Sequence, residues 1–147
     1  MDTKFIEGEP EFSPDGHWIA YSSNMSGREE VWVRAFPGPG ENKQISSSGG
    51  FAPLWSRDGK QLFYRQGSQV WVVDVMAATD FRAGKPRMLF DQPGFLATNP
   101  IRGYDISLEG DRFLMVKVWE EAPTPVTQMI LVQNWFEELK RLCPTGK

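Results

Sequence analysis

The sequence has little of several residue types that many functions require. Its 147 residues include one cysteine, Cys143, which excludes an internal disulfide framework. They include one histidine, His17, so a histidine-based metal site or a Ser-His-Asp triad would have to use it. Apolar runs such as Val70-Trp-Val-Val73 are much shorter than the roughly 20 residues of a membrane helix, and Met1–Phe5 lacks the pattern of a signal peptide.

Positive charge is not in excess either. Sixteen Lys and Arg oppose nineteen Asp and Glu, which leaves a net charge of −3. Nucleic acids and anionic bilayers are bound largely through attraction to basic surfaces. We therefore expect no nucleic-acid partner and no membrane insertion. The length suits a single domain over residues 1–147.

What the sequence does contain is a repeated turn pattern, in which an apolar residue is followed by Ser, any residue, an acid and Gly. It occurs as Phe12-Ser-Pro-Asp-Gly16, Trp55-Ser-Arg-Asp-Gly59 and Ile106-Ser-Leu-Glu-Gly110. The glycines are 43 and 51 residues apart, the length of one four-stranded propeller blade. Each copy predicts a tight hairpin turn in which serine accepts a backbone N–H and glycine adopts a positive φ.

Apolar residues follow each turn glycine at a period of two, as in a strand. Three and five residues after the glycines lie Ile19 and Tyr21, Leu62 and Tyr64, and Phe113 and Met115. The intervening Ala20, Phe63 and Leu114 are apolar too, which is typical of sheets packed on both faces. Third strands are predicted at 30–36, 69–75 and 126–132, and outer strands at 43–46 and 87–90.

The predicted fold class is therefore all-β: three four-stranded propeller blades, half of a six-bladed β-propeller, over about 7–46, 47–91 and 92–133. Asn134 followed by Glu137 matches a capping box and predicts a short C-terminal helix over about 134–142.

Three blades would leave the two end sheets uncovered, since propellers usually close with four to eight. The residues expected to be bare are Phe12, Trp18, Trp32 and Trp55 on one side, and Phe113, Met115, Trp119 and Ile130 on the other. A homodimer would close a six-bladed ring, with residues 3–6 of one chain completing the third blade of the other. A missing upstream half of a longer protein is the alternative, and the two are compatible.

At these residues the sequence resembles the TolB-type propeller repeat family, whose turn and following strand match Phe12-Ser-Pro-Asp-Gly-His-Trp-Ile-Ala-Tyr21. The segments 9–16, 26–40 and 134–139 resemble the C-terminal half of propellers attached to bacterial serine/threonine kinases and regulators. The resemblance implies a six-bladed, non-catalytic sensor or interaction domain on an extracytoplasmic face in bacteria. No kinase motif is present, so no kinase activity follows.

The residue types give no sign of catalysis. His17 directly follows a tight turn, where a surface position is expected, and no Gly-x-Ser-x-Gly elbow occurs. The acids Asp15, Asp58 and Glu109 occupy the same turn position in separate blades, so we interpret them as turn caps and not as calcium ligands. We expect no enzyme activity, no metal site and no cofactor. The tryptophans are interpreted as packing between blades.

The leading hypothesis is an interaction or sensor module that binds a protein, a peptide or a small ligand on one ring face. Loops on such a face do not pack in the core and can therefore contact a ligand. Two alternatives are the substrate-gating propeller of a peptidase and a purely structural self-assembling half-ring. The ligand-binding candidates, chosen by position in these loops, are Glu7, Glu9, Asn24, Arg28, Phe51 and Arg102.

Overall fold

A computed structural model of the chain describes residues 4–77, 80–96 and 102–117, which form strands and no helix. The all-β class is thereby confirmed. The strands are β1 (Glu7–Phe12), β2 (Trp18–Ser23), β3 (Glu30–Ala35), β4 (Lys43–Gln44), β5 (Phe51–Trp55), β6 (Gln61–Gln66), β7 (Gln69–Ala77), β8 (Phe81–Ala83), β9 (Arg87–Asp91), β10 (Tyr104–Ile106) and β11 (Phe113–Met115). The strand predicted at 126–132 and the helix predicted at 134–142 lie outside the described residues.

The strands form three antiparallel sheets in chain order. Sheet 1 has the order β1-β2-β3-β4, sheet 2 has the order β5-β6-β7 with both β8 and β9 paired to β7, and sheet 3 is β10-β11. The outer strand predicted at 87–90 is confirmed by β9, whereas the one predicted at 43–46 is shorter, because β4 pairs only at Lys43 and Gln44. Strand β8 was not expected, since three residues carry little periodicity.

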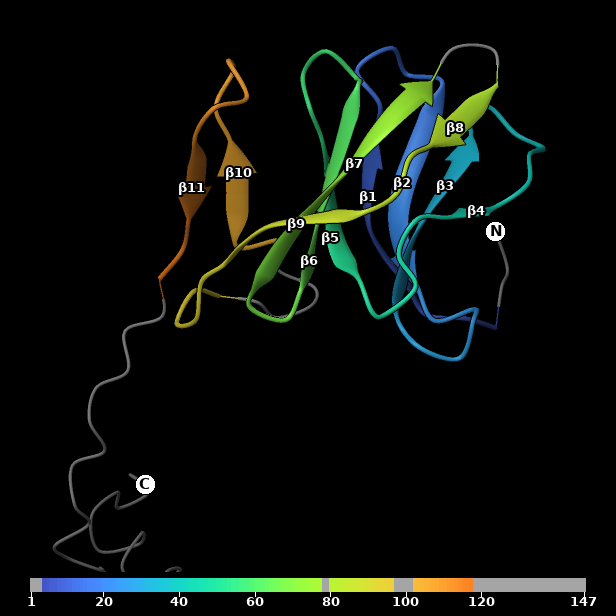
Figure 1. Ribbon diagram of the computed structural model, residues 1–147. Helices are drawn as coiled ribbons and strands as arrows, with labels where there is room; N and C mark the ends of the chain where they lie inside the picture. Colours follow the sequence, from blue (N-terminus) through green and yellow to red (C-terminus); the bar gives the residue numbers. More distant parts are fainter. Residues whose placement is uncertain (1–3, 78–79, 97–101, 118–147) are drawn as a thin grey trace, which may run out of the picture.

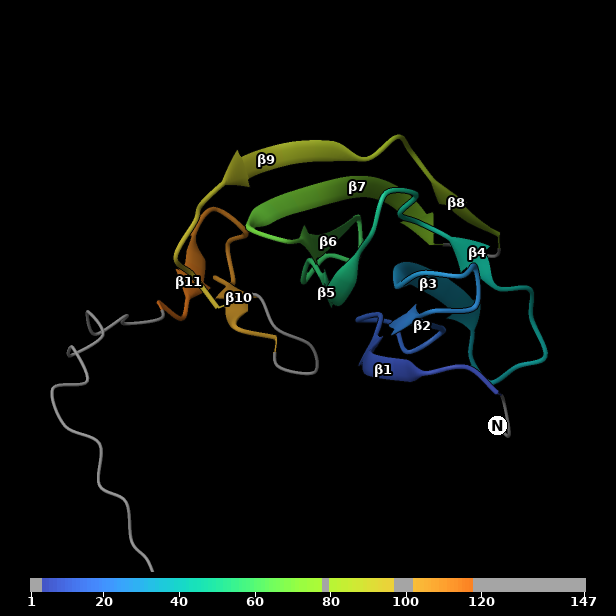
Figure 2. The same ribbon diagram turned by 90° about the horizontal axis from the view of Figure 1, so that it is seen from below.

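The three sheets stand side by side in an arc. Figure 1 shows them in chain order, with sheet 2 between the other two. Seen from below in Figure 2, the first strands β1, β5 and β10 lie on the inner side of the arc, and β8 and β9 lie on its outer side. The turns β1–β2, β5–β6 and β10–β11 all lie on the same side of the arc, at the top in Figure 1, and we call this side the turn end.

The repeated turns have the predicted structure. The glycines Gly16, Gly59 and Gly110 adopt φ values of 73°, 70° and 77°. Each turn serine accepts a backbone N–H across the hairpin, for example that of Trp18 on Ser13 Oγ at 2.9 Å. In the first two turns the serine hydroxyl donates to the expected acid, Asp15 or Asp58. In the third turn the prediction is wrong, because Ser107 Oγ donates to Asp111 and not to Glu109.

Two apolar cores lie between neighbouring sheets. The first core joins sheets 1 and 2 and contains Trp18, Ala20, Val31, Val33, Ile45, Trp55, Leu62, Tyr64, Val73, Val75 and Phe81. The second core joins sheets 2 and 3 and contains Ala52, Leu54, Phe63, Val72 and Tyr104, with Phe113 and Met115 packed against it. Residues of sheet 2 enter both cores alternately along β6 and β7, as expected for a sheet covered on both faces.

The residues predicted to be bare on the end sheets need correction. Phe12 is exposed, at 55%, but Trp18, Trp32 and Trp55 are at most 8% exposed. Trp18 and Trp55 face each other's sheets across the first core, where Phe81 of β8 lies between them at ring-centroid distances of 5.2 and 6.2 Å. Trp18 and Trp55 are core residues, which confirms their interpretation as packing between sheets, whereas Trp32 is buried but belongs to neither core between sheets.

The same correction applies to sheet 3. Phe113 and Met115 pack toward sheet 2, and the exposed residues of β11 are Leu114 (74%) and Val116, which follows it (53%). Successive residues of a strand point to opposite faces, so the prediction was wrong by one position. Trp119 and Ile130 lie outside the described residues.

Candidate functional site

Five of the six predicted binding residues begin or flank strands on the side opposite the turn end, and Glu9 is the third residue of β1. Two of them belong to the entry of sheet 1. Asn24 Oδ1 accepts the backbone N–H of Ile6 at 3.0 Å, and Asn24 N donates to Ile6 O at 3.3 Å. Glu7 is exposed and opens β1, opposite Ser23. Residues 4–6 belong to no strand, so a role for 3–6 in another sheet stays a prediction.

Glu9 joins sheet 1 to sheet 2. Its Oε2 accepts the backbone N–H of Ala52 at 2.6 Å, and the carbonyl of Ala52 accepts the hydroxyl of Tyr104 at 2.7 Å. Glu9 and Ala52 have φ values of 53° and 51°, and the strand register shifts at both positions. These bulges take peptide groups out of their own ladder and leave them free to bond to the neighbouring sheet.

Arg102 also connects sheets. Its Nη1 donates to Glu11 Oε2 at 2.7 Å, although 91 residues separate the two in the chain. Both side chains are about one-third exposed, at 35% and 30%. Together with the Glu9–Ala52–Tyr104 contacts, this ion pair fastens the inner strands β1, β5 and β10 to one another.

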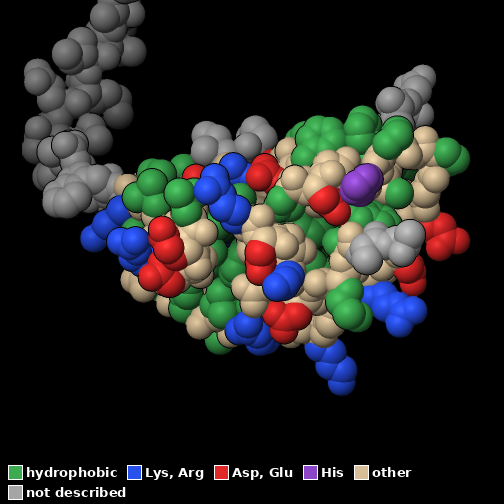
Figure 3. All heavy atoms as spheres, turned by 90° about the horizontal axis from the view of Figure 1, so that it is seen from above, with side chains coloured by type: hydrophobic (Ala, Val, Ile, Leu, Met, Phe, Trp, Pro, Cys, Tyr) green, Lys and Arg blue, Asp and Glu red, His purple; other side chains and the backbone are tan. Residues whose placement is uncertain are grey.

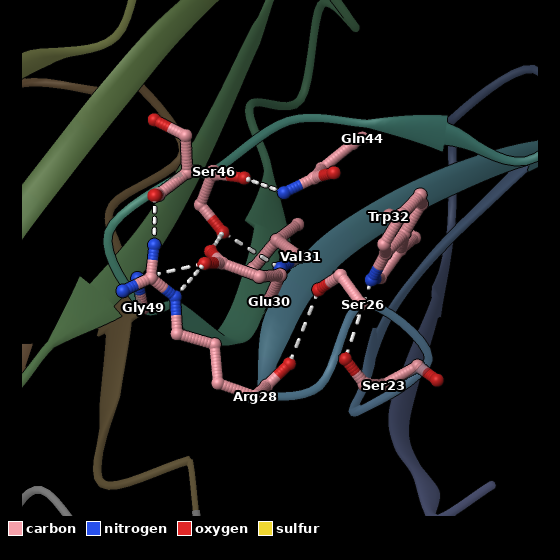
Figure 4. Close-up of polar contacts among 10 residues, drawn as sticks. Ser23, Ser26, Arg28, Glu30, Val31, Trp32, Gln44, Ser46 and Gly49 are labelled. Carbon is pink, nitrogen blue, oxygen red and sulfur yellow. Dashed lines mark hydrogen bonds and ion pairs between the residues drawn. The ribbon is translucent and has the colours of Figure 1, made fainter.

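Arg28 belongs to a polar network around the buried carboxylate of Glu30, shown in Figure 4. Arg28 Nε donates to Glu30 Oε1 at 2.6 Å, and Gly49 N donates to the same oxygen at 3.0 Å. Ser46 Oγ donates to Glu30 Oε2 and accepts the N–H of Val31 at 2.8 Å. Glu30 is 1% exposed, so its charge is stabilised by these donors and not by water.

Phe51, the sixth predicted residue, is half-buried and packs against the second core. Its neighbour in sheet 2, Arg65, was missed by the sequence reasoning. Arg65 is 1% exposed, and its guanidinium donates to the carbonyls of Leu96 at 3.3 Å and Gly67 at 3.1 Å. Burial lowers the pKa of this guanidinium. Arg65 and Ser22 stand six residues after their turn glycines, but nothing in the pattern distinguishes a buried arginine from an exposed one.

The first turn brings a serine, an aspartate and the histidine together, but in the wrong order for a catalytic triad. Ser13 Oγ donates to Asp15 Oδ1 at 2.5 Å, and His17 Nδ1 lies 3.4 Å from Asp15 Oδ2. In a triad the imidazole lies between the hydroxyl and the carboxylate, where it accepts the hydroxyl proton. Here the carboxylate lies in the middle, and Ser13 is 4% exposed. The trio caps a turn.

The serine hydroxyls also lower the pKa of the aspartates in the first two turns. The hydrogen bond from Ser13 lowers the pKa of Asp15, helped by the N–H of His17. In the second turn Ser56 and the N–H of Lys60 lower the pKa of Asp58 in the same way. Both carboxylates are therefore ionised at neutral pH.

A hollow of ≈ 1050 Å³ opens at the turn end between sheets 1 and 2. Its lining includes Asp15, Asp58, Lys60, Asp74 and the apolar end of β7 at Met76 and Ala77. Met76 is 64% exposed. Figure 3 views this end and shows acidic and basic side chains interspersed with apolar ones.

A second hollow of ≈ 380 Å³ lies at the turn end between sheets 1, 2 and 3, lined by residues such as Phe12, Arg57 and Leu108. The hollows were not predicted, because they depend on how neighbouring turns are spaced and not on any one turn. Among the described residues no helix is long and apolar enough to cross a membrane. In the same ranges, no three His, Cys, Asp or Glu side chains gather as metal ligands would.

No model of a known protein family matches the chain. The chain is 30% identical over 129 residues to a protein of Agrobacterium fabrum that is described only as uncharacterized. The match covers 80% of this chain and 43% of that protein. The chain thus spans less than half the length of the relative that it matches.

Proposed function

We propose that this chain is a non-catalytic interaction module, built as part of a β-propeller, that binds a protein or peptide at its turn end. The observation that carries the proposal is the hollow of ≈ 1050 Å³ between equivalent turns of two consecutive repeats. Propeller-type proteins present loops of neighbouring repeats on one end of the ring, where those loops are free to contact ligands.

The propeller arrangement is supported by three features. Sheet 1 is an antiparallel meander whose strands run in order from β1 to β4, and the equivalent first strands of all three sheets lie on the inner side of the arc (Figure 2). Neighbouring sheets pack face to face through apolar cores. The relative is more than twice as long as the region matched, which leaves room for further repeats of this kind.

The absence of catalysis is supported by what the reactive groups of the described residues already do. Ser13 and Ser56 each donate to an aspartate and accept a backbone N–H inside a turn. His17 faces a carboxylate and has no hydroxyl to activate. Binding without covalent chemistry is the use that leaves these contacts intact.

A protein or peptide fits the turn end better than a small ligand. The hollow lies open between two turns, and small-molecule sites instead enclose most of the ligand surface. Its rim offers the exposed thioether of Met76 beside charged groups of both signs, Asp58 and Lys60, which lie 3.8 Å apart. Methionine is common on surfaces that adapt to peptide partners.

The test begins with peptides selected by display against the purified chain, whose affinities are then measured by calorimetry. Met76→Glu places a charge in the hollow without touching a core, so we expect at least a tenfold loss of affinity, about 1.4 kcal/mol. Met88→Glu is the matched control, because Met88 is 50% exposed on β9 and outside the hollow.

Two results would contradict the proposal. One is that no peptide is enriched above background by the folded chain. The other is that the enriched peptides bind Met76→Glu and Met88→Glu equally well, which would place their site elsewhere.

A further inference from the structure

The first core is built by one face of sheet 1 and the facing side of sheet 2. Sheet 2 contributes Leu62 and Tyr64 from β6 and Val73 from β7, all at most 2% exposed. Sheet 1 contributes Trp18, Ala20 and Val33, and the last two are fully buried. The interface between consecutive repeats therefore has two distinct halves: sheet 2 supplies the positions three and five residues after its turn glycine, and sheet 1 supplies the position four residues after its own.

The face of sheet 1 that points away from sheet 2, which we call its outer face, repeats the half that sheet 2 supplies to the first core. Ile19 and Tyr21 stand three and five residues after Gly16, as Leu62 and Tyr64 stand after Gly59. The strand pairing agrees, because Tyr21 lies opposite Trp32 as Tyr64 lies opposite Trp71. Since alternate residues point to opposite faces and Ala20 faces sheet 2, Ile19 and Tyr21 face away from it.

This outer face is apolar and partly open. A groove of ≈ 500 Å³ runs along it, lined by Pro10, Ile19, Tyr21, Phe36 and other residues that include Glu7 and Arg34. Phe36 is 44% exposed and Phe12 is 55% exposed, and their rings lie edge to face at 5.0 Å. In sheet 2 the equivalents of these two positions, Val75 and Trp55, are buried in the first core.

The outer face of sheet 3 repeats the other half. Leu114 and Val116 stand four and six residues after Gly110, the positions that Ala20 and Ser22 occupy in sheet 1. Ala20 and Ser22 are buried, at 0% and 1% exposure, whereas Leu114 and Val116 are 74% and 53% exposed. The chain thus carries both halves of its own repeat interface, each without a partner among the described residues.

We propose that a second copy of this chain covers both faces, with the outer face of sheet 1 in one copy packed on the outer face of sheet 3 in the other. The inference rests on the propeller arrangement of the proposed function. A two-fold axis makes the two contacts equal, so the assembly closes at two copies and leaves neither face bare. A copy of the same chain is the occupant because it brings the matching half.

The experiment measures the mass of the full chain by light scattering at protein concentrations from about 1 to 100 µM, which span the dissociation constants of weak and moderate dimers. We expect a species of twice the 16.7 kDa chain mass. Leu114→Glu and Phe36→Glu each place a charge in both contacts of the dimer, so each is expected to raise the dimer dissociation constant by at least about 100-fold. Met88→Glu, on neither outer face, should leave the dissociation constant within about twofold of the unmodified chain.

Circular dichroism of each variant establishes that it is folded, as expected for substitutions at exposed positions. A monomer up to 100 µM would overturn the inference, as would a dimer that survives both Leu114→Glu and Phe36→Glu. Masses that keep growing beyond two copies would overturn the closed, reciprocal contact. Peptide affinity measured on the same samples separates the two proposals: a monomer that still binds turn-end peptides refutes only the second copy, and a dimer that binds none refutes only the binding module.

Discussion

At the scale of single residues, each hairpin turn depends on one serine hydroxyl that connects two groups. Ser13 Oγ accepts the N–H of Trp18 at 2.9 Å and donates to Asp15 Oδ1 at 2.5 Å. The aspartate then accepts the N–H of His17 at 3.0 Å. A glutamate side chain is longer by one methylene and does not close this ring, which accounts for the use of Asp111 in place of Glu109 in the third turn.

These contacts predict a pH dependence for the first turn. The pKa of Asp15 is lower in the folded protein than its ordinary value of 3.8, so its contribution to stability is present above that pH and is lost as the pH falls through the folded value. We expect Asp15→Asn to lower the midpoint of thermal unfolding by about 2–4 °C at pH 7, a small effect because the group is near water. The difference should shrink as the pH falls below 3.8.

Thermal unfolding followed by circular dichroism at pH 7, 4 and 2 checks this prediction. Glu109→Gln is the control, since Glu109 stands at the equivalent position but accepts no bond from the turn serine. A deficit of Asp15→Asn that is equally large at pH 2 and pH 7 would show that the carboxylate charge has no part in the turn.

At the scale of elements, the buried Glu30 ties the start of β3 to the segment that connects sheets 1 and 2. Its two carboxylate oxygens accept from Arg28, Ser46 and Gly49, so β3, the loop before it and the connection after β4 are held at one point. A carboxylate is needed because all three neighbours are donors.

We predict that Glu30→Gln destabilises the protein by about 2–3 kcal/mol, because an amide replaces one acceptor by a donor that faces other donors in a buried site. Urea unfolding followed by tryptophan fluorescence measures the loss. Arg28→Ala is the comparison: its side chain is 59% exposed, and Ser46 and Gly49 still donate to Glu30, so a smaller loss of about 1 kcal/mol is expected. Equal losses for the two variants would contradict the central role of the buried carboxylate.

The strands themselves were largely predictable, because their apolar residues repeat at a period of two. The pattern located the turn between β5 and β6 and the start of the long strand β7, which was predicted at 69–75 and extends over Gln69–Ala77. It did not decide which alternate set faces outward on sheet 3, since Phe113, Leu114 and Met115 are all apolar. Only the packing of Phe113 against Phe63, at a ring-centroid distance of 5.4 Å, makes that choice.

At the scale of the whole molecule, the sheets are joined at the inner side of the arc by hydrogen bonds and an ion pair that no local sequence pattern predicts. Glu9 and Ala52 adopt a left-handed backbone, which is uncommon outside glycine. They occur at the same place in consecutive repeats, seven residues before the turn glycine, so the bulge is part of the repeat. The predicted binding residues Glu9 and Arg102 bond across sheets because they lie at this junction.

The junction predicts that the stability of sheet 3 depends on one hydroxyl. Tyr104 is 5% exposed and donates to Ala52 O at 2.7 Å, and burial raises the pKa of its phenol. In Tyr104→Phe the ring still fills the second core, but the carbonyl of Ala52 loses its donor, at a cost of about 1–2 kcal/mol. Hydrogen exchange measured by mass spectrometry should become about 5–30-fold faster in β10 and β11, while exchange in β2 and β3 stays unchanged.

Tyr64→Phe is the matched control, because that ring packs in the first core, away from sheet 3. Faster exchange throughout the molecule in Tyr104→Phe would mean that the three sheets unfold as one unit, and unchanged exchange in β10 and β11 would mean that the hydroxyl does not hold sheet 3 to sheet 2.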